Sequence, residues 1–258
     1  MNPSHSTPPP ILPGTPAPDP NNLPLGSNPA EQAPVSGVFG AIEALLRQPR
    51  RILFQLRQSG SALIGALVLV AVVAAAIYGV VVGTFSGGSQ LWAAPAKIVV
   101  GLLLSGLICL PSLYIFSCLG GSQARLIEVC GLVAGLLALM TILLIGFAPV
   151  AWVFSQSIDS LAAMGALHLG FWFIATYFGV RFLSAGFRLL GERAGGGLNV
   201  WVIIFLLVML QMTTALRPIL GRSDQLLTNE KKFFLSHWAE CLKMTDEVSK
   251  TRLELRRQ

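Results

Sequence analysis

Charge is scarce in this chain and nearly absent from its middle. Asp, Glu, Lys and Arg make up 12% of the 258 residues, about half the share found in soluble domains. The apolar fraction is 53% and the mean hydropathy is +0.68. Most charges lie in the two tails and in short loops, so the composition excludes an ordinary soluble domain.

Recognisable catalytic and metal-binding motifs are also missing. The four cysteines form neither a C-x-x-C pair nor a Cys/His pattern, which argues against a zinc or haem site. The apolar stretches hold no carboxylate pair, no Gly-x-Ser-x-Gly and no phosphate-binding Gly-x-x-x-x-Gly-Lys-Ser/Thr. A membrane hydrolase or a proton-coupled pump needs at least one such group of residues. We therefore expect neither an enzyme nor a cofactor, and a lipid enzyme with a site assembled from scattered residues ranks last.

The basic residues do not indicate a nucleic-acid site. The net charge of +6 would suit a nucleic acid, but the sequence has no basic stripe with interleaved aromatic residues. The lysines and arginines instead flank the apolar stretches, where they attract anionic lipid headgroups. We therefore expect the lipid bilayer, and no nucleic acid, among the partners.

Long apolar stretches are what the chain has in abundance. Each approaches or exceeds the roughly 20 residues that a helix needs to cross the hydrocarbon core of a bilayer. There are five of them, over residues 62–84, 98–120, 127–154, 160–184 and 199–216. The sequence therefore predicts an all-α fold: a polytopic transmembrane helix bundle of about five spans over residues 59–217, with amphipathic flanking helices.

Two segments precede the spans. Residues 1–35 hold most of the prolines and little apolar area, which predicts a disordered arm with polyproline character. Residues 36–58 combine apolar residues at helical spacing with four arginines, Arg47, Arg50, Arg51 and Arg57. This pattern favours a basic amphipathic helix in the membrane interface, with its arginines on lipid headgroups. The alternative is a short soluble helix packed on the loops.

The distribution of basic residues sets the expected orientation. Arginines cluster before the first stretch, between the second and third, and between the fourth and fifth, whereas the other loops carry only Lys97 and Asp159. By the positive-inside rule the N-terminus is cytoplasmic, and five spans then leave the C-terminus external. Basic residues after the fifth stretch oppose this assignment, and a re-entrant third or fourth stretch would reverse the C-terminus. We expect a protein of the inner (plasma) membrane, with residues 218–258 as an amphipathic, charged tail.

Few polar residues fall within the spans. His168 lies about two turns into the fourth stretch, Gln211 and Thr213 lie near the end of the fifth, and Arg217 marks its boundary. Polar and ionisable residues inside a membrane are costly and often functional, so these four form a possible intramembrane polar site. A lone membrane histidine nevertheless hydrogen-bonds between helices more often than it relays protons.

Small residues suited to helix packing are frequent in the same stretches. Gly79 with Gly83, and Gly131 with Gly135, are small-x-x-x-small pairs that let helix backbones approach closely. They predict a compact bundle.

The end of the last stretch carries a resemblance to known proteins. The string Thr213-x-x-Leu216-Arg217-Pro218-x-x-Gly221 resembles the ending of a group of bacterial five-span inner-membrane proteins. The N-terminal arm, the lead-in over residues 45–53 and the five clustered spans are similar in architecture to the YIP1 family, although the long charged tail departs from the usual ending. The resemblance implies a non-catalytic membrane protein that acts through protein or lipid contacts, and it transfers no functional residue.

These features lead to two main hypotheses for function. The first is a non-enzymatic scaffold or accessory subunit that acts through protein and lipid contacts, with a membrane-protein partner or a second copy of itself. The second is a permease or channel-like component for a small neutral or lipidic substrate, with His168, Gln211 and Thr213 along its path. Since five spans cannot form two inverted halves, such a permease would function as an oligomer.

Overall fold

The computed structural model of the chain describes residues 25–59, 61–86, 90–122, 124–157, 161–191 and 196–215. In these ranges 91% of the residues are helical and no strand is present. The predicted all-α fold is therefore confirmed. The far N-terminal arm, Asp159, Arg217 and the predicted tail over residues 218–258 lie outside the described residues.

Four helices are long and apolar enough to cross a membrane. They are α4 (Ser61–Ser86), α5 (Gln90–Leu119), α6 (Leu126–Ser157) and α7 (Leu161–Leu189). The fifth, α8 (Gly196–Ala215), has 20 residues, of which Gly197–Met212 form a shorter apolar run. Twenty residues give α8 a length of about 30 Å, which matches the hydrocarbon thickness. The predicted multi-pass architecture is present, with four full-length spans and a shorter fifth helix.

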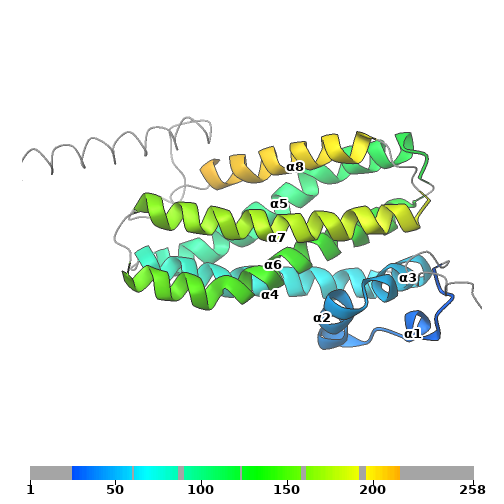
Figure 1. Ribbon diagram of the computed structural model, residues 1–258, viewed down its shortest axis with the longest axis horizontal. Coiled ribbons are helices and arrows are strands. Elements are labelled where there is room, and N and C mark those ends of the chain that lie inside the picture. The colour runs from blue at the N-terminus through cyan, green and yellow to red at the C-terminus, as the bar shows by residue number, and fades with distance from the viewer. Residues whose placement is uncertain are drawn as a thin grey trace, which may run out of the picture.

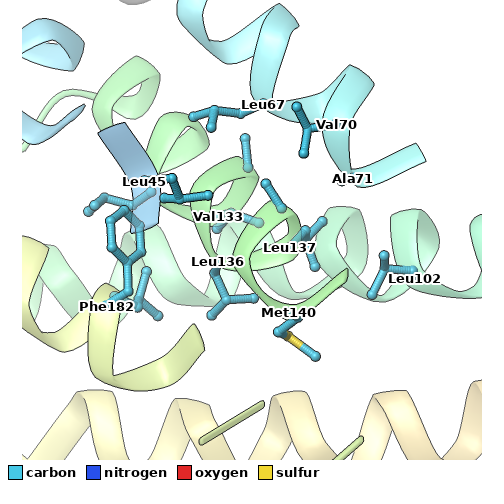
Figure 2. Close-up of a cluster of buried hydrophobic side chains, with 14 of the residues drawn as sticks. Leu45, Leu67, Val70, Ala71, Leu102, Val133, Leu136, Leu137, Met140 and Phe182 are labelled. Carbon is cyan, nitrogen blue, oxygen red and sulfur yellow. The ribbon is translucent and has the colours of Figure 1, made fainter. Parts of the chain in front are cut away.

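The long helices run along the long axis of the molecule and form a bundle (Figure 1). α6 packs against α4 and α7, α4 also packs against α5, and α8 packs along α5. Figure 2 shows the core where α6 meets its neighbours: Val133, Leu136, Leu137 and Met140 of α6 lie among side chains of the surrounding helices. α6 is the most buried of the spans, and it organises the bundle.

The segment before the spans forms three helices at one end of the bundle, which we call the α3 end (Figure 1). They are α1 (Pro29–Gln32), α2 (Gly37–Arg47) and α3 (Pro49–Ser59). The single helix predicted for residues 36–58 is broken at Gln48, because Pro49 disfavours the helical conformation at the residue before it and suits the first position of a new helix. Residues 25–35 fold against α3, so the disordered arm predicted through residue 35 does not extend that far.

The apolar side of α3 packs on protein. Ile52, Leu53 and Leu56 are at most 4% exposed, and Leu45 of α2 is buried beside them. A Cβ placed on Gly131 of α6 would overlap Leu56, so this glycine makes room for the α3 side chain. The apolar side of α3 therefore packs on the spans α6 and α7 and not on the loops of the alternative, while the interfacial location of this helix stays a prediction.

The glycine pairs bring different elements together. A Cβ on Gly79 would lie 2.5 Å from Pro95 Cα, so α4 and α5 approach backbone to backbone there. Gly83, one turn later, is buried as well. Gly131 faces α3, whereas a Cβ on Gly135 would lie 2.6 Å from Phe182 of α7. The second pair therefore serves two separate contacts, one with α3 and one with α7.

Candidate functional site

A hydrogen-bonded pair of polar side chains links α4 to α7 inside the bundle. Tyr78 Oη and His168 Nδ1 are 2.6 Å apart. Tyr78 is fully buried and His168 is 6% exposed. His168 lies about two turns from the start of α7 and Tyr78 about two turns from the end of α4, so both sit well within the apolar layer.

Aromatic rings surround this pair. Tyr78 meets Trp172 edge to face at 6.4 Å between ring centroids, and His168 meets Phe171 in the same way at 6.2 Å. Phe171 in turn stacks on Phe147 of α6 at 4.7 Å. The rings exclude water from the pair, and such aromatic contacts add stability beyond their buried area.

The second ring nitrogen of His168 takes no part in this hydrogen bond. His168 Nε2 is buried and has no hydrogen-bond partner among the described residues. If Tyr78 donates to Nδ1, Nε2 carries a hydrogen without an acceptor; if Nδ1 donates, Nε2 is an acceptor without a donor. An unmatched buried nitrogen costs free energy, and it is the one feature of the pair that a purely structural role does not explain.

Lys97 is a buried charged residue in the same half of the bundle. The prediction that it lies in an outer loop is wrong: α5 begins at Gln90, eight residues before the predicted start of the second span, and Lys97 is 5% exposed. It comes two residues after Pro95, the residue against which Gly79 packs. Lys97 therefore lies near the depth of Tyr78 and His168, where a charged side chain is costly and is usually functional or paired.

Several serine and threonine hydroxyls of the spans bond to their own helices. Ser105, Thr141, Thr176 and Ser184 each donate to a carbonyl four residues back, at 2.7–3.0 Å. The α5–α8 contact has its own polar link, because Trp201 Nε1 donates to the Cys109 carbonyl at 2.9 Å. Each of these hydroxyls therefore has its hydrogen-bond acceptor in its own helix, whereas the Trp201 indole joins α8 to α5.

The predicted polar site is divided by the structure. His168 on α7 has Tyr78 of α4 as its partner, whereas Gln211 and Thr213 lie on α8, which packs along α5. Tyr78 and Lys97 are the residues that sequence reasoning missed. A tyrosine within the otherwise aliphatic run of α4 was the available signal for the first.

The four arginines of the N-terminal segment have separate partners, and Arg57 Nε lies 4.0 Å from a Glu128 carboxylate oxygen. Arg47 pairs with Glu43 at 3.5 Å on the exposed side of α2. Arg50 pairs with Glu31 at 2.6 Å, and Arg51 donates to the carbonyls of Ala33 and Pro34. The prediction that all four bind lipid headgroups stays a prediction, and at least Arg50 and Arg51 also hold the chain's own N-terminal residues.

The side chains of Arg125 and Glu128 join α3 to the start of α6. Glu128 accepts from the Arg125 backbone N–H at 2.9 Å and pairs with the Arg125 guanidinium at 3.3 Å. Arg125 also donates to the Arg57 carbonyl at 2.9 Å. Glu128 thus closes the first turn of α6 in the manner of a capping box, while Arg125 fastens that turn to α3.

Comparison of the chain with protein-family models, curated proteins and solved structures gives no match. Within the described ranges no three His, Cys, Asp or Glu side chains are grouped so that they could hold a metal ion. The function must therefore be argued from the bundle itself.

Proposed function

We propose that this protein is a non-enzymatic scaffold or accessory subunit of the inner (plasma) membrane, with a cytoplasmic N-terminus and an external C-terminus. It acts through contacts with a membrane-protein partner, or with a second copy of itself, and with anionic lipid headgroups. The resemblance to five-span inner-membrane proteins and the arginine-rich α3 end agree with this assignment.

The observation that carries the proposal is where the polar groups of the spans are directed. Tyr78 and His168 join α4 to α7, and Trp201 joins α8 to α5. The hydroxyls of Ser105, Thr141, Thr176 and Ser184 bond to carbonyls of their own helices. A substrate path needs polar groups that face a shared space. The groups named here instead join two helices or bond within one helix, which supports a protein that functions by presenting surfaces.

The test is crosslinking of the tagged chain in intact membranes, followed by purification in mild detergent and quantitative mass spectrometry. We expect a membrane-protein partner at near-stoichiometric yield, absent from an unrelated multi-pass protein carrying the same tag. Recovery of the chain only as a monomer, with and without crosslinker, would contradict the proposal.

A permease or channel-like component is the second candidate. It is favoured by one observation, the buried Lys97 together with the unmatched Nε2 of His168. A buried cation and an open ring nitrogen at similar depth would suit polar groups of a small neutral substrate, carried by an oligomer. Solute uptake by liposomes that depends on both side chains would support this candidate over the first.

A further inference from the structure

Helix α7 has one side that the described helices leave uncovered. Its buried side, which includes Phe171 and Phe182, packs mainly on α6. The other side exposes a row of residues at spacings of four, three and four: Gly170, Ile174, Tyr177 and Arg181. We call this row the α7 seam. Its spacing is the one at which a second helix packs along the first, and a Cβ on Gly170 would meet nothing within 4 Å.

The seam carries a charge that this chain does not pair. Arg181 is exposed and makes no hydrogen bond or ion pair within the part of the chain that the structure describes. Tyr177, one turn before it, meets the ring of Phe178 edge to face at 5.4 Å, and its hydroxyl has no hydrogen bond among the described residues either. Residues four apart on a helix are neighbours, so the seam presents two adjacent unpartnered polar side chains.

The depth of Arg181 makes its charge costly in lipid. The 29 residues of α7 span about 44 Å, so the helix extends about 7 Å beyond each side of a hydrocarbon layer of roughly 30 Å. Arg181 lies eight residues before Leu189, the last residue of α7, which places its Cα about 5 Å inside the layer. Helix side chains lean toward the N-terminus, and for Arg181 this direction leads deeper into the layer, away from the nearer headgroups.

Charge complementarity selects among the possible occupants of the seam. Two copies of this chain in one membrane have the same orientation, so seam-to-seam packing would bring their two Arg181 side chains together, and such like-charge contacts are unfavourable. An intramembrane carboxylate on another protein would instead pair with the guanidinium in two parallel hydrogen bonds. Intramembrane charges are commonly paired with one another in this way, so a partner span with an acidic residue fits the seam.

We infer that the α7 seam is the docking surface for a transmembrane helix of a different protein, and that this helix carries an Asp or Glu that pairs with Arg181. Gly170 lets the partner backbone approach closely, and the Tyr177 hydroxyl supplies a further hydrogen bond within the contact. The inference rests on the proposed function as an accessory subunit and adds the surface, the class of partner and the residue that selects it.

The test places a photoreactive amino acid at position 177 of the full chain in intact membranes and identifies the crosslinked peptide by mass spectrometry. The matched control carries the same amino acid at position 73, because Val73 of α4 is 49% exposed and, like Tyr177, lies twelve residues from the α3 end of its helix. We expect position 177, and not position 73, to crosslink to a span of another protein that has an Asp or Glu about one turn away.

Charge reversal provides the second measurement. Arg181→Glu should lower the crosslink yield at position 177 at least about tenfold, as expected when one member of a buried charge pair is lost. An arginine in place of the partner's carboxylate should restore the yield, and Arg181→Lys should retain most of it. Since Arg181 has no partner within the described residues, Arg181→Glu should leave unfolding of the purified protein in micelles unchanged, which separates lost docking from lost folding.

The outcomes distinguish this inference from the proposed function. A crosslink from position 177 to lipid alone or to a second copy of the chain would overturn the inference, as would a protein crosslink that survives Arg181→Glu. The proposed function would still stand if general crosslinking recovers a stoichiometric partner. Recovery of the chain only as a monomer would overturn both.

Discussion

At the residue scale, the Tyr78–His168 hydrogen bond is the contact that fastens α7 to α4. Each side chain alone would be a costly polar group in an apolar layer, and the bond removes most of that cost. Their fixed separation of 2.6 Å also sets the rotation of both helices. The unmatched Nε2 is the remaining penalty.

This bond should have a measurable coupling energy. We expect a double-mutant cycle of Tyr78→Phe and His168→Ala to give about 0.6 kcal/mol, with about 1.7 kcal/mol as the upper range for such membrane pairs. The measurement is reversible unfolding in mixed micelles. Tyr177→Phe is the control, since Tyr177 lies on α7 with 62% of its surface exposed. A coupling energy of zero between Tyr78 and His168 would mean that the bond contributes nothing to stability.

The glycines of α4 give a second prediction at this scale. Gly79→Ala places a methyl group 2.5 Å from the Pro95 backbone, which cannot move aside as a side chain can. We expect a loss of about 1–3 kcal/mol in the free energy of unfolding, as for other overpacked sites. Gly65→Ala on the same helix meets nothing within 4 Å and should be close to neutral; equal effects would place α5 further from α4 than the structure does.

At the element scale, α3 acts as part of the bundle. Leu53 and Leu56 fill space left by Gly186 and Gly131, so α3 wedges between the ends of α6 and α7. Arg125 adds a hydrogen bond from the start of α6 to the Arg57 carbonyl. A helix held by apolar and polar contacts should unfold with the spans and not before them.

Truncation of Leu56 tests this role. We expect Leu56→Ala to cost about 2–5 kcal/mol, as for other buried leucines, and to speed hydrogen exchange over α3. Leu46→Ala, at a half-exposed leucine of α2, should stay within about 0.5 kcal/mol of the parent. Unchanged exchange of α3 in Leu56→Ala would show that the helix is held by lipid and not by the spans.

The elements that could be predicted are those whose sequence signals are local along the chain. Apolar length is a local property, so the spans were evident from sequence, and Pro49 could have marked the break between α2 and α3. Tyr78 and His168 are 90 residues apart, and nothing local identifies either as the other's partner. Lys97 is assigned to a loop by the sequence prediction because a span defined by its apolar length begins after this charged residue. The preceding residues, Leu91–Ala94, nevertheless suit a helix.

At the scale of the whole molecule, α8 decides whether the two termini lie on the same side of the membrane or on opposite sides. Four spans would leave both termini on one side, whereas five place them on opposite sides. α8 packs along α5 and is about 30 Å long by its 20 residues, which is enough to cross. Its apolar run is nevertheless the shortest of the five.

Reporter fusions test this count. We expect a periplasmic reporter enzyme fused after Gln258 to be active, and the same enzyme fused before Met1 to be inactive, because the proposed orientation puts the arginine-rich α3 end in the cytoplasm. A cytoplasmic fluorescent reporter should give the opposite pattern. Reporters at both termini that indicate the cytoplasm would mean that α8 does not cross the membrane.

The central claim is that the intramembrane polar residues hold helices together and do not carry a solute. Its most direct test is proton flux into liposomes that contain the protein, driven by a potassium diffusion potential and followed with an enclosed pH-sensitive dye. The account predicts protein-free background flux for the parent and for His168→Ala, while His168→Ala unfolds more readily. Flux in the parent that His168→Ala abolishes would contradict it.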